Sequence, residues 1–139
     1  MVHALREAHR VLKPEGLLLD VRPAPVHRRV GLMSHARQWK LVAPMRENLD
    51  DDRAANAAVK TAIRERLFKR QAYASLGLNR HIDTISDFRA WLQEFSTLGP
   101  FPPHDWMVRK VETALANSSR KTKLVVRGPL EIRVLRKLP

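Results

Sequence analysis

The hydrophobic positions at the start of the chain change from helical spacing to a continuous run. One helical face carries the apolar residues Val2, Leu5, Ala8 and Leu12. Pro14 cannot continue this helix, and Gly16 suits the left-handed conformation that often ends one. Leu17–Val21 follows as a mainly apolar run of strand length, and Pro23 ends it. A run without alternation is typical of a strand covered on both faces, so the pattern predicts a helix followed by a buried strand.

Two helices are predicted in the middle of the chain from their first residues and their apolar spacing. The first begins at Asp50, because consecutive Asp residues satisfy free N–H groups and complement the helix dipole there. Its apolar positions are Ala55, Val59, Ala62, Ile63 and Leu67. Gly77 and Asn79 are expected to mark its end. The second helix follows Thr84 and Asp87, which have the spacing of a capping box, and its apolar stripe is typical of a core.

The segments on either side of these two helices carry weaker patterns. Residues 26–45 show no clear period, and a short helix over residues 34–42 is predicted within them. Gly and Pro at residues 99–103 break the chain, and a further helix begins at His104 and ends near Asn117. Residues 26–116 are therefore expected to be mainly helical.

The C-terminal residues carry two apolar runs separated by turn residues. Leu124–Val126 and Leu130–Leu135 flank the sequence Arg-Gly-Pro, which predicts an antiparallel hairpin. The second run alternates with Glu131 and Arg133, a pattern that suits a strand at the edge of a sheet.

The first helix and strand also carry a set of residues typical of one protein family. Those residues are Glu7, Arg10, Val11, Leu12, Lys13, Pro14 and Gly16. The segment resembles the fourth-helix-to-fifth-strand segment of class I S-adenosylmethionine-dependent methyltransferases, although Glu15 replaces the commoner Gly. In that family the segment lies past the middle of the catalytic domain. The chain thus resembles the C-terminal half of a methyltransferase fold, and the specific match covers about the first 23 residues.

The resemblance implies an α/β fold class, a partial Rossmann-like methyltransferase half-fold of about three strands with a helical insert. One strand is of the parallel type and two form a C-terminal antiparallel pair. Leu17–Val21 would be the family's fifth strand, Leu124–Val126 its sixth and Leu130–Leu135 its seventh, which the family inserts between the other two. A single domain is expected, divided into a helix–strand unit at residues 1–25, the insert at 26–116 and the hairpin at 117–139.

The resemblance also implies methyl transfer from S-adenosylmethionine, yet the residues that hold the donor are missing. The family binds it with a glycine-rich turn at a helix N-terminus and an acidic residue after the second strand. The five glycines here make no Gly-x-Gly loop. We therefore expect no cofactor binding and no activity from this chain alone. Asp20 and Arg22 are the candidates for a vestigial or shared catalytic site, because α/β sites form at the carboxyl ends of strands.

The missing half has a physical consequence for the strand at Leu17–Val21. Without the family's fourth strand, this strand would have one unpaired edge and one uncovered apolar face, and both features recruit partners. We expect a homodimer through that edge, or a complex with a separate N-terminal methyltransferase half.

Charge leaves a second class of function open. The chain carries 26 Lys and Arg against 14 Asp and Glu, a net charge of +12, which attracts polyanions without sequence preference. The alternatives to a methyltransferase portion are therefore a basic nucleic-acid-binding module and a regulatory or interaction module. The absence of cysteine, of a secretory signal and of a membrane-spanning run favours a cytoplasmic location without membrane attachment.

Other chemistries are poorly supported by the residues. His81 with Asp83, and His104 with Asp105, could form a base and its orienting carboxylate, but such neighbours usually serve turns and caps. Asp50–Asp52 is better explained as a helix start than as a cation site. The six histidines show no metal-ligand spacing, so no metal site is expected.

Overall fold

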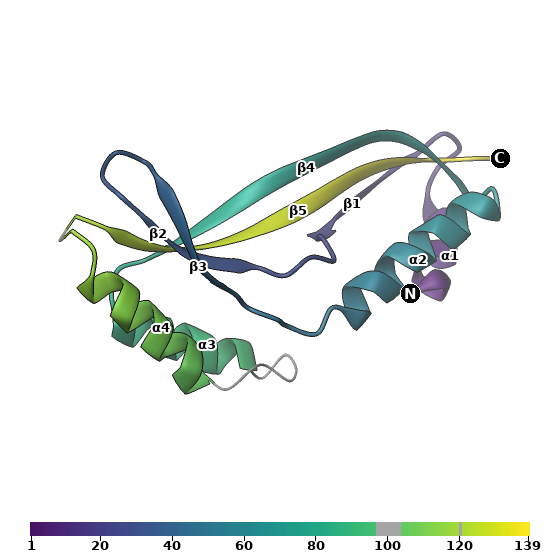
Figure 1. Ribbon diagram of the computed structural model, residues 1–139. Coiled ribbons are helices and arrows are strands. Elements are labelled where there is room, and N and C mark those ends of the chain that lie inside the picture. Colours follow the sequence, from purple (N-terminus) through teal and green to yellow (C-terminus); the bar gives the residue numbers. More distant parts are fainter. Residues whose placement is uncertain (97–103, 120) are drawn as a thin grey trace. The chain divides into compact units, whose positions relative to one another are not determined.

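The computed structural model describes residues 1–96, 104–119 and 121–139, and within them the chain is mixed α/β (Figure 1). Four helices and a five-stranded antiparallel sheet are formed in this part of the chain. In chain order they are α1 (Val2–Val11), β1 (Leu17–Pro23), β2 (Arg29–Met33), β3 (Trp39–Pro44), α2 (Asp50–Arg64), β4 (Phe68–Ile82), α3 (Ile85–Ser96), α4 (His104–Ala116) and β5 (Lys123–Lys137). The break expected at residues 99–103 lies outside the described residues.

The chain divides into two compact units that share the two longest strands. Unit 1 contains Met1–Pro25, Leu49–Leu76 and Pro129–Pro139, and unit 2 contains Val26–Asn48 and Gly77–Gly128. Unit 1 therefore holds α1, β1, α2, the start of β4 and the end of β5. Unit 2 holds β2, β3, α3, α4 and the remaining parts of β4 and β5.

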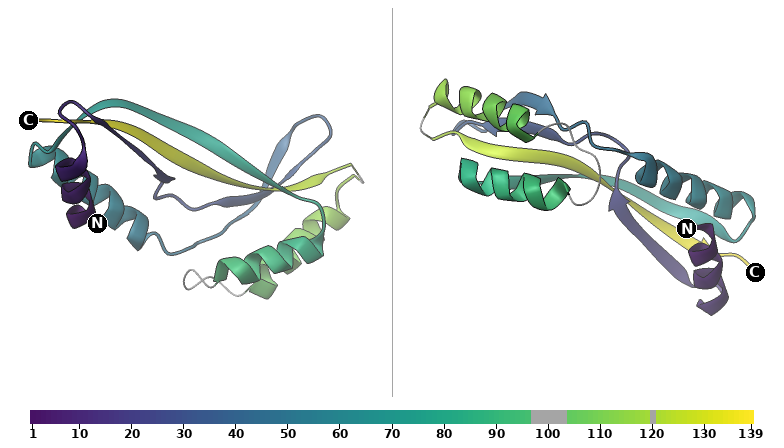
Figure 2. Two further views of the ribbon diagram at one scale, coloured as in Figure 1. Left: turned by 180° about the vertical axis from the view of Figure 1, so that it is seen from behind. Right: turned by 90° about the horizontal axis from the view of Figure 1, so that it is seen from below.

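In unit 1 the helices α1 and α2 lie on the same side of the strands (Figure 2). Their apolar faces meet the sheet in a core made of Leu5, Ala58, Val59, Ala62, Phe68 and Leu135. The alanines of α2 allow close packing, and Phe68 is fully buried, with the centroid of its ring 5.5 Å from that of the His9 ring in an edge-to-face arrangement. The helical spacing that predicted α1 is confirmed.

The strand β1 is confirmed at Leu17–Pro23, but it is covered on one face only. It pairs antiparallel with β5, from Leu17 opposite Arg136 to Pro23 opposite Leu130, so it is not part of a parallel ladder. The alternate residues Leu17, Leu19 and Val21 are 54%, 62% and 50% exposed. Because successive side chains point to opposite faces, Asp20 and Arg22 lie on the half-buried face with Leu18.

In unit 2 the helices α3 and α4 pack with β2, β3 and β5 around an aromatic core. The buried members are Val30, Leu32, Ala43, Met45, Ile82, Phe88, Trp91, Leu92, Met107, Val108, Val111, Leu124 and Val126. The predicted capping box of α3 is confirmed, since the Asp87 N–H donates to Thr84 Oγ1 at 3.0 Å. The Thr84 hydroxyl in turn contacts Asp87 Oδ2 at 2.6 Å, which fixes the start of the helix.

Residues 26–82 contain more β-structure than the expected mainly helical insert. The helix predicted over residues 34–42 is wrong, because β2 and β3 form a hairpin there. Gly31 is required in β2, since a Cβ at this position would lie 2.6 Å from the Trp39 ring. The hairpin turn holds Arg37 at a φ of 58°, and the Ser34 N–H donates to the Gln38 carbonyl at 2.9 Å.

The predicted end of the long helix at Gly77 is also wrong, because α2 ends at Arg64. The Leu67 N–H bonds to the Ala62 carbonyl and the Arg66 N–H bonds to the Ile63 carbonyl, which is the bonding of a Schellman motif. Arg66 occupies the left-handed position, with a φ of 59°. Because this position usually holds glycine, an arginine here does not indicate a helix end, and the sequence does not predict that β4 begins at Phe68.

The predicted C-terminal hairpin is a single strand in the structure. β5 runs from Lys123 to Lys137, and it is an interior strand rather than an edge. Lys123–Arg127 pairs with β2, and Leu130–Arg136 pairs with β1. Gly128 and Pro129 lie between these two ladders, where the missing N–H of Pro129 breaks no bond of either, and the Pro129 carbonyl accepts the Ala24 N–H.

Candidate functional site

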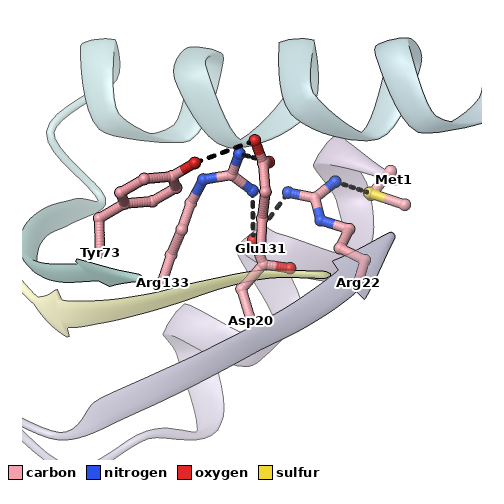
Figure 3. Close-up of polar contacts among 6 residues, drawn as sticks. All are labelled: Met1, Asp20, Arg22, Tyr73, Glu131 and Arg133. Atoms are coloured by element: carbon pink, nitrogen blue, oxygen red, sulfur yellow. Dashed lines mark hydrogen bonds and ion pairs between the residues drawn. The ribbon is translucent and has the colours of Figure 1, made fainter. Parts of the chain in front are cut away.

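The two sequence candidates, Asp20 and Arg22, belong to a cluster of charged side chains in unit 1 (Figure 3). Both extend from β1 into a cluster that also contains side chains of β4 and β5. β5 contributes Glu131 and Arg133, and β4 contributes Tyr73. The register places Asp20 opposite Arg133 and Arg22 opposite Glu131, so the strand pairing itself assembles this cluster.

The Asp20 carboxylate joins two guanidinium groups. Arg22 Nη2 donates to Asp20 Oδ2 at 2.7 Å, and Arg133 Nη1 donates to the same oxygen at 3.1 Å. Arg133 also pairs with Glu131 through its second terminal nitrogen. The Tyr73 hydroxyl donates to Glu131 Oε1 at 3.2 Å, and the Arg133 guanidinium lies 5.8 Å from the centroid of the Tyr73 ring.

These charges are largely removed from water and balance one another. The side chains of Asp20, Arg22, Glu131 and Arg133 are only 11–16% exposed. Two carboxylates face two guanidiniums, which offsets the cost of burying each charge. The Arg22 Nε is buried and has no hydrogen-bond partner among the described residues, while its Nη1 contacts the sulfur of Met1 at 3.8 Å.

The arrangement of these side chains favours a structural role, in which the cluster links three strands, and does not favour a catalytic role in proton transfer. A general base needs a carboxylate that can reach a substrate proton, and both carboxylates here are engaged by arginine. The Asp20–Arg133 pair crosses from β1 to β5, and the Tyr73–Glu131 hydrogen bond crosses from β4 to β5. The cluster therefore holds β1, β4 and β5 together near the C-terminal end of β1.

The remaining sequence candidates are not assembled into a site. His81 has an exposed side chain near the end of β4, and Asp83 follows that strand. The side chain of His104 lies outside the described residues. Asp50 begins α2 and pairs with Arg53 at 3.5 Å, as a helix start requires. Within residues 1–96, 104–119 and 121–139, no group of three or more metal-ligating side chains occurs.

Sequence reasoning missed Tyr73, Glu131 and Arg133 as members of the cluster. The alternation of Glu131 and Arg133 predicts the polar face of an edge strand, and this prediction is wrong because β5 is an interior strand. The polar face of β5 is instead the one that pairs with Asp20 and Arg22. The signal was the matching alternation Asp20-x-Arg22 in the first strand, with charges complementary to Glu131-x-Arg133.

Comparison of the chain with the models of known protein families and with curated proteins found no match. Among the described residues, no helix combines the length and the apolar character needed to cross a membrane.

Proposed function

We propose that this chain is the C-terminal portion of a class I S-adenosylmethionine-dependent methyltransferase, serving methyl transfer only when a donor-binding half is joined to it. The single observation that carries the proposal is the strand order of unit 1. The last strand of the chain, β5, pairs with β1 on one side and with β4 on the other. In the methyltransferase fold the last strand likewise lies between the two strands that precede it.

The order of elements in unit 1 supports the same proposal. The order of these elements, α1, β1, α2, β4 and β5, is that of the last helices and strands of the family. The hairpin of β2 and β3 is an addition to this order. The sixth strand of the family then corresponds to β4 and the seventh to the whole of β5. This assignment replaces the one made from the C-terminal residues of the sequence alone.

The residues of unit 1 do not fit the methyl donor by themselves. The carboxylate of Asp20 is engaged by two arginines, so it is not free to accept hydrogen bonds from a ribose. The chain has no glycine-rich turn that could approach a ligand closely. Donor binding is therefore assigned to the joined half, and this chain completes the sheet.

The surface available to the joined half is the free edge of β1 and the apolar face beside it. Leu17, Leu19 and Val21 are exposed, and their partners on β5 are Arg136, Val134 and Ile132. Among the described residues, β1 pairs with β5 only, so its second edge is open to a further strand. A sheet-bearing half that brings a strand and covering helices satisfies both features.

Calorimetric titration with S-adenosylhomocysteine tests the proposal. The chain alone is expected to give no heat of binding. A chimera that places the first four strands of a well-folded class I methyltransferase ahead of Val2 is expected to bind one equivalent. Leu19→Lys in the chimera is expected to abolish binding, because the new charge would be buried at the joined face.

Two results would contradict the proposal. Binding of the ligand by the chain alone would show that the donor site has been misplaced. A folded chimera that fails to bind would show that unit 1 cannot complete a methyltransferase sheet. The oligomeric state of the chain alone is measured by sedimentation. A stable dimer that Leu19→Lys dissociates would mean that a second copy of the chain covers the apolar face of β1.

A further inference from the structure

A groove in unit 2, unrelated to the charged cluster of unit 1, lies between the edge strand β3 and the helix α4. We call it the β3–α4 groove. Its volume is about 390 Å³. The residues that line it are Lys40, Leu41, Val42, Trp106, Arg109, Lys110, Thr113 and Ala114. Its floor is apolar, and its rim carries three cations.

The rim cations have no carboxylate partner in the part of the chain that the structure describes. Lys40, Arg109 and Lys110 are all exposed, and none of the ion pairs of unit 2 includes them. The Lys110 ammonium instead lies 4.7 Å from the centroid of the Trp106 ring. A cation over an aromatic ring keeps its charge, so the rim retains three positive charges that a ligand could neutralise.

The groove also borders unpaired backbone. Among the described strands, β3 pairs with β2 only, so its outer edge is open. The bond from Ser34 to Gln38 makes these residues a hydrogen-bonded pair, and the ladder then alternates through Met33–Trp39, Leu32–Lys40 and Gly31–Leu41. Trp39 and Leu41 therefore direct their N–H and C=O groups away from β2, toward the open edge.

We propose that the β3–α4 groove binds an acidic peptide segment of a partner protein in an extended conformation. The peptide adds a strand to the open edge at Trp39 and Leu41, and main-chain hydrogen bonds hold it there. Its alternate side chains face the groove, where carboxylates meet Lys40, Arg109 and Lys110. Pairing fixes the register of the peptide, and the three cations select its charge.

Single-stranded nucleic acid fits the same surface less well. Proteins that bind single strands offer open aromatic faces on which bases stack. Trp106 is half-buried against the core, and Lys110 lies over its ring. Trp39 has two cations near its ring, since the guanidinium carbons of Arg29 and Arg127 are 5.7 and 4.5 Å from its centroid. The rings beside the groove are already covered by cations.

Fluorescence anisotropy with defined peptides tests the inference on the full chain. The probe is a labelled peptide in which Glu alternates with Val. A peptide of the same sequence methylated at every backbone nitrogen keeps the charge and removes all of the backbone donors, so it is expected to bind at least about tenfold more weakly. Equal binding of the two peptides would overturn the proposed strand addition.

Charge-reversal variants locate the site. Arg109→Glu with Lys110→Glu is expected to weaken binding of the probe at least about tenfold, because the reversed charges repel its carboxylates. Lys60→Glu with Arg64→Glu is the matched control, since these exposed cations lie on α2 in unit 1 and change the net charge equally. An equal loss of affinity in both variants would show that binding depends only on net charge, and it would overturn the proposed site.

A single-stranded oligothymidylate is measured with the same three proteins. Weak binding of the oligothymidylate that both double variants reduce to a similar extent would support the peptide site, because it indicates a non-specific polyanion effect. Tighter binding than the peptide, lost specifically in Arg109→Glu with Lys110→Glu, would assign the groove to nucleic acid and overturn the proposal. The thermal midpoint of each variant, expected to stay well above the temperature of the binding measurement, shows that the fold is retained.

Discussion

The two units of the chain differ in what they place beside their cations. In unit 1 the arginines contact carboxylates, as in Arg6 with Glu65 and Arg133 with Asp20. In unit 2 several cations lie over aromatic rings instead, as in Arg80 over Trp91, Lys110 over Trp106 and Arg127 over Trp39. The first arrangement cancels positive charge, whereas the second stabilises the fold and leaves the charge in place.

Sequence counts sharpen this difference. Unit 1 contains 13 Lys and Arg against 8 Asp and Glu, and unit 2 contains 13 against 6. All three tryptophans fall in unit 2. A unit with an excess of cations and with rings to support them is the part of the chain that attracts anions. The exposed cations of unit 2 are therefore the better placed of the two sets to bind an anionic partner.

The largest effects are expected from the two cores, because among the described residues each unit contains a fully buried phenylalanine. Phe88→Ala in unit 2 and Phe68→Ala in unit 1 are each expected to cost about 3–5 kcal/mol, through lost burial and the cavity left behind. Hydrogen exchange should show lost protection mainly in the unit that carries the change. Equal loss across both units in either variant would mean that the chain unfolds as one body.

A smaller effect is expected from the charged cluster of unit 1. Asp20→Ala leaves Arg22 and Arg133 without their shared carboxylate and should cost about 2–3 kcal/mol, measured by urea unfolding. Asp20→Leu with Arg133→Leu removes one charge of each sign and leaves Arg22 directly opposite Glu131, so it should cost less than the single change. A double variant that is less stable than Asp20→Ala would show that the ion pairs themselves supply the stability.

The capping box of α3 should contribute about 1 kcal/mol. Thr84→Ala removes the oxygen that accepts the Asp87 N–H, and such changes usually cost this amount. Thr84→Ser keeps the hydroxyl and is the control that should retain most of the stability. Similar losses in Thr84→Ala and Thr84→Ser would assign the effect to the lost methyl group instead.

The smallest effects are expected from two matched exposed ion pairs. Arg6–Glu65 joins α1 to α2 at 2.9 Å, and Arg89–Glu112 joins α3 to α4 at 2.8 Å. Glu65→Ala and Glu112→Ala should each cost less than about 1 kcal/mol, because exposed pairs are screened by water and salt. A loss that persists in high salt would contradict a screened surface pair.

The helices could be predicted from residues close together in the sequence, whereas the positions of the strands depend on pairing between distant segments. The periodicity of α1, the capping box of α3 and the helix at His104 are confirmed, because each depends on residues within a few turns. The end of α2 was missed because Arg66 takes the left-handed position without glycine. The long strand β4 was missed because nearly all of its residues between Phe68 and Ile82 are exposed, so it shows no buried face.

The candidate site could be predicted only in part for the same reason. Asp20 and Arg22 were found from their place after an apolar run, but their partners depend on the register with β5. Gly128 and Pro129 suggested a turn that would have folded Glu131 and Arg133 back along the preceding strand. A proline between two ladders breaks no bond, which is a fact of pairing that the local sequence does not contain.

The double pairing of β5 also constrains the order in which the chain can fold. β1 and β2 are each synthesised well before β5, with which both of them pair. Neither of these two ladders can close until the helices and strands between them have been synthesised. During that interval the apolar side chains of β1 and β2 lack their neighbours on β5, which exposes the nascent chain to aggregation.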